Sequence, residues 1–351
     1  MDVLREEYRV LYDHLQQRFA TGDLAPGAGD TYSRHYQGDR WSPDRMQMHG
    51  AIMEELRASC AGLPRDGHAV LLTAGPPGAG KGGAREFLMA RQGDSTDLGQ
   101  ALAEAHGVDT SRYVVLDPDE VKKVIVRHGG APELSSQAME LPGGRQLAPA
   151  EYASLIHRES AYLQDQFALW AKRQGYNLLF DSSMKSLPKT QDLLADLARS
   201  GYGQRIVLSV EVPMATSLEQ NALRWQKGRR AYEKGDDSYG GRMVPESTIH
   251  ALYPQGTEAA SVSRTNAETL HAQGHLTGLI EFDRGNWTAA APKQHTPVIR
   301  HESLEAGMRV RIAAAAAATS TTVSQPVPGG PAQPAASTRQ QPHQRGHGHS
   351  R

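Results

Sequence analysis

Apolar residues at the start of the chain recur at the spacing of one helix face. Between Val3 and Phe19 they are separated by charged and polar residues, as in an amphipathic helix. A second helix is expected from Ser42, which stands before Pro43 in the arrangement of a helix cap and a first-turn proline, to Cys60. The pattern therefore predicts a helical N-terminal segment.

Beyond this segment, short apolar runs alternate with longer stretches of helical periodicity. The runs with the character of buried strands are 69–73, 113–116, 177–180, 205–212 and 279–282. The helical stretches between them are 84–90, 151–174, 190–200 and 216–225. Such alternation predicts a parallel sheet with helices on both faces, in which ligands bind at the carboxyl ends of the strands.

The composition of the 351-residue chain is that of a globular protein, with 38% hydrophobic and 22% charged residues. A formal net charge of -1 gives no general attraction to nucleic acid or to an anionic membrane, so neither is an expected partner. The single cysteine, Cys60, excludes an intramolecular disulfide and a cysteine-rich metal site. Because the N-terminus lacks a signal-peptide core and no apolar run could span a bilayer, we expect a cytoplasmic location.

A glycine-rich loop follows the first predicted strand and has the composition of a phosphate-binding P-loop. The residues that we expect to bind the nucleotide are Gly75, Pro76, Pro77, Gly78, Ala79, Gly80, Lys81, Gly82 and Gly83. Small residues let backbone N–H groups turn toward the phosphates, while the helix that starts near Lys81 adds the positive end of its dipole. A nucleoside triphosphate is therefore the predicted ligand.

The loop departs from the usual pattern directly after its lysine. A serine or threonine normally follows and ligates Mg²⁺, but here Lys81 is followed by Gly82 and Gly83. Magnesium would then be held by phosphate oxygens, waters and a carboxylate from elsewhere in the chain. We assign no residue as a direct metal ligand.

Two aspartates, Asp117 and Asp119, follow the second predicted strand. Phosphoryl transfer requires a carboxylate that accepts the proton of the attacking hydroxyl and orients it. Aspartate is also a favoured cap for a helix such as the one predicted from Glu120. The local sequence leaves both roles open.

Two further groups of polar residues follow later strands. Asp181, Ser183 and Lys185 suit substrate hydroxyls or Mg²⁺-bound water, although a polar loop before a helix has the same composition. Arg224 and Arg242 lie in a region rich in arginine and glycine. Such a region is typical of a kinase lid, whose arginines neutralise phosphate charge, and equally of a solvated basic loop.

In their order and spacing, these motifs resemble the zeta-toxin family. The segments that carry the resemblance are the P-loop, residues 114–119, residues 155–160 leading to 175–183, and Arg224 followed by 241–245. Together they cover residues 69–249. The resemblance implies a kinase that uses ATP or GTP with Mg²⁺ to phosphorylate the 3′-hydroxyl of UDP-N-acetylglucosamine. Because family members are often toxins of toxin–antitoxin pairs, it also makes an antitoxin protein a candidate partner.

The resemblance implies a role for each of the catalytic candidates. Lys81 matches the phosphate-binding lysine and Asp119 the general base, with Asp117 as a supporting carboxylate. Arg224 and Arg242 match the two arginines that clamp the transferred phosphate.

The same resemblance implies contacts with the acceptor substrate. Asp181 and Ser183 stand where the family has an acidic residue and a serine or threonine, and Lys185 stands where an arginine is often found. Asp165 lies near a helical position at which some members use a glutamate, and Glu159 is an alternative on the same helix.

We therefore expect an α/β fold with a P-loop kinase-like parallel sheet in three parts. These are an N-terminal helical extension (1–66), a zeta-toxin-like kinase domain (67–311) and a disordered low-complexity tail (312–351), whose composition cannot bury enough apolar area to fold. The expected activity is phosphorylation of a UDP-sugar. The alternatives are a nucleotide-binding interaction module with weak or no catalysis, which Gly82 favours, and a kinase for an antibiotic or nucleoside.

Overall fold

The computed structural model of the protein describes residues 3–27, 29–67, 69–91, 109–256 and 260–283. The tail predicted over 312–351 lies outside these residues. The three-part division of the chain therefore stays a prediction. None of the helices that the structure describes is long and apolar enough to cross a membrane.

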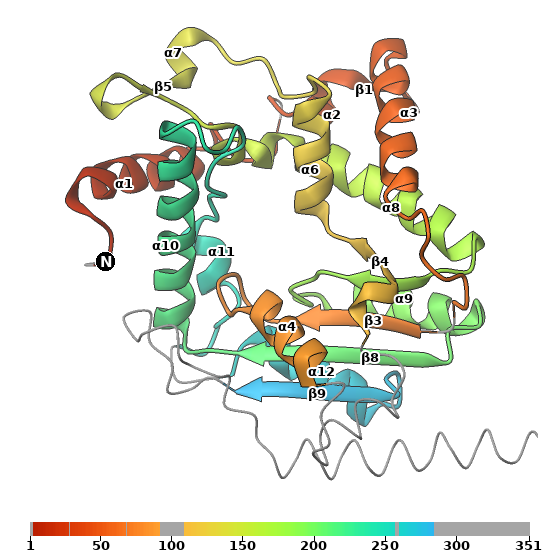
Figure 1. The fold of residues 1–351 in the computed structure, drawn as a ribbon. Helices are drawn as coiled ribbons and strands as arrows, with labels where there is room; N and C mark the ends of the chain where they lie inside the picture. The colour runs from red at the N-terminus through yellow and green to blue at the C-terminus, as the bar shows by residue number, and fades with distance from the viewer. Residues whose placement is uncertain (1–2, 28, 68, 92–108, 257–259, 284–351) are drawn as a thin grey trace, which may run out of the picture. The chain divides into compact units, whose positions relative to one another are not determined.

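A five-stranded parallel sheet is the centre of the fold (Figure 1). Its strands are β3 (Ala69–Ala74), β4 (Tyr113–Leu116), β7 (Asn177–Phe180), β8 (Gln204–Glu211) and β9 (Gly278–Asp283). They are arranged in the order β4-β7-β3-β8-β9, and every neighbouring pair is parallel. The five predicted strands are confirmed, each to within one residue at either end.

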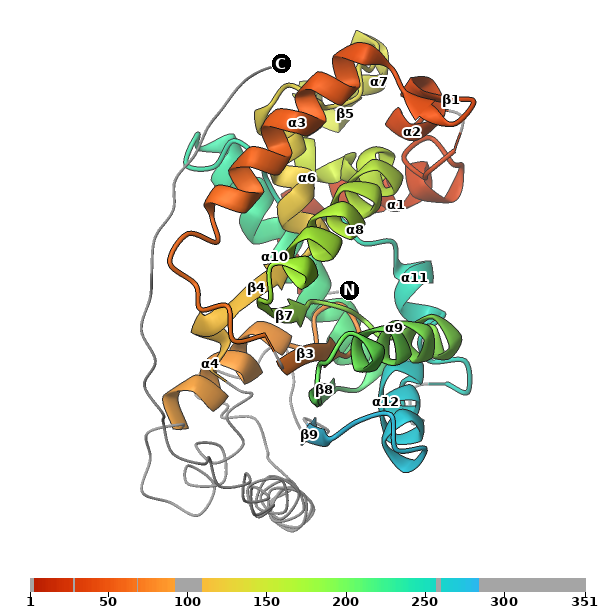
Figure 2. The ribbon, with the colours of Figure 1, turned by 90° about the vertical axis from the view of Figure 1, so that its right-hand side faces the viewer.

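The central strand β3 is buried on both sides, and five of its six residues are apolar, the exception being the buried Thr73. Successive side chains of a strand point to opposite faces, so Val70 and Leu72 pack in one core while Leu71 packs in the other. Helices α8 (His157–Arg173), α9 (Leu187–Arg199) and α12 (Val262–Ala272) contribute to the first core, and α4 (Lys81–Arg91) contributes to the second. Helices cover both faces of the sheet, and α9 lies beside α12 (Figure 2).

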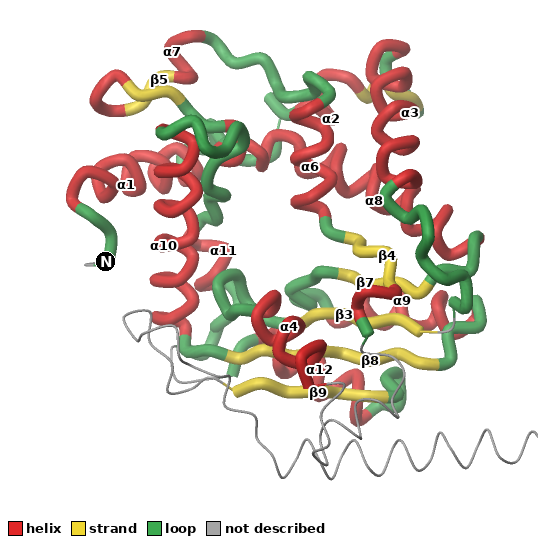
Figure 3. The backbone as a smooth tube through the Cα atoms, viewed as in Figure 1, coloured by secondary structure: helices red, strands yellow, loops and turns green. Residues whose placement is uncertain are grey.

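The remaining elements are drawn above this sheet in Figure 3. The helices are α1 (Glu6–Ala20), α2 (Thr31–His35), α3 (Pro43–Ala58), α6 (Pro118–Arg127), α7 (Ser136–Met139), α10 (Met214–Glu233) and α11 (Glu246–His250). Two small antiparallel hairpins pair β1 (Tyr36–Gln37) with β2 (Arg40–Trp41), and β5 (Glu140–Leu141) with β6 (Arg145–Gln146). The helix predicted over 151–174 is divided, since short 3₁₀ turns precede α8.

The N-terminal helices pack on the rest of the protein at separate places. Helix α1 uses Tyr8 and Tyr12, whose rings meet the indole of Trp225 on α10 edge-on. Helix α3 packs with α8, and its buried Ile52 belongs to the same core as Val70 and Leu72 of β3. Sequence patterning thus correctly predicted both helices, and their apolar faces contact the α/β core.

Candidate active site

The P-loop connects β3 to α4 in a conformation in which Gly75, Gly78 and Gly80 all have a positive φ, and at the first two a side chain would also clash. Gly75 has φ 145°, and a Cβ atom there would lie 2.5 Å from the Val210 carbonyl oxygen on β8. Gly78 has φ 81°, and its Cβ would lie 2.7 Å from the Ser217 carbonyl oxygen. The Ser217 hydroxyl donates a 2.6 Å hydrogen bond to the Pro77 carbonyl. The loop is therefore held against both β8 and α10.

Lys81, the first residue of α4, curls back over this loop. Its ammonium donates a 3.2 Å hydrogen bond to the Gly75 carbonyl. Burial lowers the pKa of Lys81. The charged groups to which the ammonium is electrostatically coupled are Asp181, Arg224, Arg242 and Asp117. The lysine therefore lies in a charged cluster at the carboxyl ends of the strands.

The glycine after this lysine is not required by packing. Gly82 is exposed, and a Cβ added to it would meet no atom within 4 Å. The absence of the usual hydroxyl is thus a property of the sequence alone, because a serine side chain would fit.

Asp117, at the end of β4, is the cap of α6. Its Oδ1 accepts a 2.8 Å hydrogen bond from the backbone N–H of Asp119. Burial raises the pKa of Asp117 to about 6, and the nearby carboxylates of Asp119 and Asp181 act in the same direction. The capping role that the sequence left open between the two aspartates therefore belongs to Asp117.

Asp119, in the first turn of α6, is held between two cations. Its Oδ1 lies 3.1 Å from the Lys122 ammonium, and its Oδ2 forms an ion pair with the Arg242 guanidinium. Burial tends to raise the pKa of Asp119, but Arg242 and Lys122 together bring it below the ordinary value. The carboxylate is therefore ionised and oriented by contacts at both of its oxygens.

A hydroxyl on β3 fixes the loop that follows β7. Thr73 is buried and donates a 2.8 Å hydrogen bond to Oδ1 of Asp181, while the Ser182 N–H donates to the Thr73 hydroxyl. The Asp181 N–H continues the sheet by donating to the Leu116 carbonyl. These bonds place Asp181 between the P-loop strand and β4.

The rest of this loop is tightly constrained. Met184 is buried in the left-handed conformation, with φ 53°, and its carbonyl accepts a 2.9 Å hydrogen bond from the Asn266 side chain on α12. A non-glycine residue in this region is strained, so tertiary contacts must hold it there. Ser183 and Lys185 stand on either side, half-buried and exposed respectively.

The segment that carries Arg242 packs closely, backbone against backbone, on the helix that carries Arg224. Arg224 is exposed on α10 and electrostatically coupled to Arg242. A Cβ on Gly241 would lie 2.0 Å from the Trp225 carbonyl oxygen, and one on Gly228 would lie 2.5 Å from the Gly241 Cα. These glycines therefore let the segment before Arg242 lie directly on α10. The contacts of both glycines are those of tight backbone packing.

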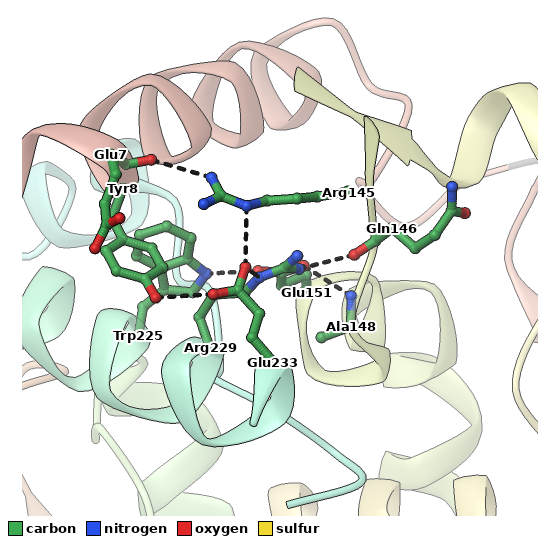
Figure 4. A network of polar contacts seen from close by, with 9 residues as sticks. All are labelled: Glu7, Tyr8, Arg145, Gln146, Ala148, Glu151, Trp225, Arg229 and Glu233. Atoms are coloured by element: carbon green, nitrogen blue, oxygen red, sulfur yellow. Dashed lines mark hydrogen bonds and ion pairs between the residues drawn. The ribbon is translucent and has the colours of Figure 1, made fainter. Parts of the chain in front are cut away.

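A buried polar network supports the helix that carries Arg224 (Figure 4). The carboxylate of Glu151 accepts hydrogen bonds from the Trp225 indole at 2.9 Å and the Ala148 N–H at 2.8 Å. It also pairs with the guanidinium of Arg229 at 2.8 Å, and neither charged side chain has more than 2% exposure. Arg229 in turn reaches Glu233 at 3.0 Å. Helix α10 is thus tied to the 3₁₀ turns before α8.

The network extends to the N-terminal helix. The Tyr8 hydroxyl donates a 2.8 Å hydrogen bond to Glu233, and the Arg145 guanidinium lies 3.3 Å from the same carboxylate and 3.2 Å from the Glu7 carbonyl oxygen (Figure 4). Helix α1, the β5–β6 hairpin and α10 therefore share one set of polar contacts.

Two predicted substrate residues are not brought to this cluster. Glu159 is fully buried, and its carboxylate contacts the Arg45 guanidinium at 2.9 Å and the His49 ring at 2.6 Å. It therefore connects α8 to α3. Asp165 lies further along α8 on its exposed side.

Three residues beside Asp119 were not predicted as site residues. Lys122 is buried next to it. His157, at the start of α8, and Tyr239, before the glycine pair, are both electrostatically coupled to it. Burial lowers the pKa of His157 to about 4, with the Lys122 charge acting in the same direction, so the ring is neutral near pH 7. Only Lys122 had a sequence signal, since residues three apart on a helix are neighbours.

A P-loop that joins a central parallel strand to a helix, with cations and carboxylates at the strand ends, defines a P-loop kinase-like fold. The model of the zeta toxin family matches residues 58–286. The chain belongs to this family. Comparison with curated proteins gave no match.

Comparison with solved structures gave matches of low sequence identity. One is from the PezAT chromosomal toxin–antitoxin system of Streptococcus pneumoniae, with a TM-score of 0.43 and 12% identity over 80% of this chain and 98% of that chain. Another is the AvrRxo1-ORF1:AvrRxo1-ORF2 complex with sulphate ions, with a TM-score of 0.42 and 15% identity over 69% of this chain and 64% of that chain. The same pair solved with ATP gives a TM-score of 0.42 and 14% identity.

Proposed function

We propose that the protein transfers the γ-phosphoryl group of ATP or GTP to a hydroxyl of a UDP-sugar, with the 3′-hydroxyl of UDP-N-acetylglucosamine as the first candidate. The observation that carries the proposal is the convergence of Lys81, Asp119 and Arg242 at the carboxyl ends of the strands. Family membership supports the same reading. Arg242 pairs with a carboxylate in the first turn of α6, whereas the arginines of a solvated basic loop would face water.

The P-loop and the two arginines are the proposed binding groups for the nucleoside triphosphate, the phosphoryl donor. Lys81 neutralises phosphate charge from within the loop, and the start of α4 presents backbone N–H groups. Arg224 and Arg242 neutralise the charge that develops on the transferred group, which is the largest contribution that a protein makes to this chemistry.

On the acceptor side, Asp119 is the proposed base. It orients the attacking hydroxyl and accepts its proton as the new oxygen–phosphorus bond forms and the bond to the leaving nucleoside diphosphate breaks. Asp117 supports it by capping α6 and thereby fixing the backbone of Asp119. Asp181, Ser183 and Lys185 are the proposed contacts to the remainder of the sugar nucleotide.

The carboxylates at the strand ends fit magnesium, which prefers oxygen ligands and keeps several waters. Asp181 lies close enough to Asp117 for its charge to raise the pKa of the Asp117 carboxyl. They would hold the ion through its waters, and the bound ion would neutralise β- and γ-phosphate charge. Within the described residues no group of three or more histidine, cysteine or carboxylate ligands is arranged for a metal, so the phosphates must supply the remaining ligands.

A nucleotide-binding protein with little turnover is the second candidate, and Gly82 favours it. Without a hydroxyl after the lysine, magnesium would be less well positioned between the β- and γ-phosphates. An antitoxin that binds this protein is compatible with either candidate.

The direct test is to incubate the protein with ATP and Mg²⁺ and a panel of UDP-sugars, nucleosides and aminoglycosides. We expect a mass gain of one phosphate on a UDP-sugar and none in the Lys81→Ala variant. Phosphorylation of a nucleoside or antibiotic instead would replace the proposed acceptor. ATP binding with no product from any acceptor would favour the second candidate.

A further inference from the structure

The two cations that hold Asp119 differ in how firmly they are placed. Lys122 lies on the same helix, one turn away, and its side chain has 8% exposure. Arg242 comes from the segment between α10 and α11, and its side chain has 42% exposure. One partner is part of the packed interior and the other is at the surface of the site.

Lys122 cannot readily leave the carboxylate. Its neighbours Val121 and Ile125 on α6 are buried in the same core as β3, and the helix begins at its cap, Asp117. Moving the ammonium away would require α6 to unpack or leave a buried charge without a partner, which is costly.

Arg242 is under no such constraint. An exposed ion pair is weak, because water competes for both partners. The guanidinium is coupled to Arg224 and lies in the charged cluster that includes Lys81. A triphosphate in the P-loop would bring several negative charges to this cluster, and a guanidinium binds phosphate strongly through two parallel hydrogen bonds.

Resting on the proposed function, we propose that Lys122 is the permanent partner of Asp119 and a positioning residue for the transfer, whereas Arg242 is a partner that the nucleotide removes. In the structure, Arg242 is paired with Oδ2 of Asp119. When the triphosphate binds, Arg242 moves to the phosphates and Oδ2 becomes available to the acceptor hydroxyl. Lys122 stays paired with Oδ1 and thereby maintains the orientation of the carboxylate.

This exchange has a consequence that can be measured without turnover. Because Arg242 must leave Asp119 before it binds phosphate, the ion pair competes with the nucleotide. Removing the charge of Asp119 should therefore strengthen nucleotide binding, but only while Arg242 is present. The matched control is the same Asp119 substitution in an Arg242→Ala background, in which the exchange cannot occur.

The experiment is calorimetric titration with a non-hydrolysable ATP analogue and Mg²⁺, above pH 7 so that Asp119 is ionised, with melting curves to check folding. We expect Asp119→Asn to bind the analogue about 2- to 5-fold more tightly than wild type, the strength of an exposed ion pair. In an Arg242→Ala background the same substitution should give no gain. Equal affinity of wild type and Asp119→Asn, or an equal gain in the Arg242→Ala background, would overturn the exchange while leaving the proposed function intact. A wild-type protein that binds no nucleotide refutes both.

The positioning role of Lys122 is tested by separating turnover from binding. Lys122→Met should keep the nucleotide affinity and the acceptor KM while kcat falls by about tenfold or more, and Lys122→Arg should restore part of the rate. A folded Lys122→Met variant with wild-type kcat would show that Arg242 is the partner that matters. A fall confined to the melting temperature would make Lys122 merely structural.

Discussion

The carboxylate of Glu151 and the guanidinium of Arg229 form an ion pair in the interior of the protein, 2.8 Å apart and almost completely shielded from water. Breaking such a pair from one side leaves a buried charge without a partner. We therefore expect Glu151→Ala to lower the free energy of unfolding by about 3–5 kcal/mol. Glu233→Gln, at an exposed position of the same network, should cost only about 1 kcal/mol or less. Denaturant unfolding of both variants is the measurement, and similar losses would contradict the distinction.

The contact between Gly241 and α10 predicts a second sensitive position. A methyl group on Gly241 would overlap the Trp225 carbonyl oxygen, so Gly241→Ala should displace Arg242 and reduce activity more than stability. Gly203→Ala is the control, because a Cβ there meets nothing within 4 Å. Measuring kcat/KM and the melting temperature of both variants shows whether activity falls more than stability. Wild-type kcat/KM in Gly241→Ala would show that the segment can shift without consequence.

Restoring a hydroxyl after the P-loop lysine should improve metal binding. The space at Gly82 is open, and a serine there would supply the oxygen that usually ligates Mg²⁺. Gly82→Ser should lower the Mg²⁺ concentration needed for half-maximal nucleotide binding, by about tenfold at most if one charge-assisted contact is gained. Gly82→Ala separates this effect from the gain in helix propensity. Identical behaviour of the two variants would mean that the hydroxyl does not reach the metal.

The raised pKa of Asp117 predicts a pH-dependent stability. In the folded protein this carboxyl titrates at about 6, above the ordinary value of 3.8. The contribution of Asp117 to the free energy of unfolding is therefore most favourable below the pKa that this carboxyl has in the unfolded chain. That contribution is lost as the pH rises through 6. Asn keeps the helix cap without the charge, so Asp117→Asn should raise the melting temperature at pH 8 by about 2–4 °C. The gain should vanish at pH 4, and a gain independent of pH would contradict the burial of the charge.

The parts of the fold that local sequence determines were predictable. Residues 69–74 form a strand because every side chain is small or apolar, and the glycine pattern after it defines the P-loop without knowledge of the rest of the chain. The short helix α11 was missed, since five residues carry too little periodicity to be recognised.

The site was less predictable because its contacts join distant segments. Asp117 and Asp119 are equivalent in local sequence, and only the geometry shows which one caps α6 and which one pairs with Arg242. Glu159 looked available on a helix near the site, but its partners Arg45 and His49 come from α3, more than a hundred positions away in the chain. No local pattern signals such a buried cluster.

If the P-loop delivers the γ-phosphoryl group to an acceptor hydroxyl, Lys81 is the residue on which this transfer most depends. ATP carrying an isotopic label in its γ-phosphate should be mixed with UDP-N-acetylglucosamine, Mg²⁺ and either the wild-type protein or Lys81→Ala, with Lys123→Ala as a control for the loss of an exposed lysine. If the protein is this kinase, labelled phosphate should appear on the 3′-hydroxyl of the sugar with the wild type and with Lys123→Ala. A folded Lys81→Ala variant should give none. Equal transfer by the wild type and Lys81→Ala would contradict this role of the P-loop.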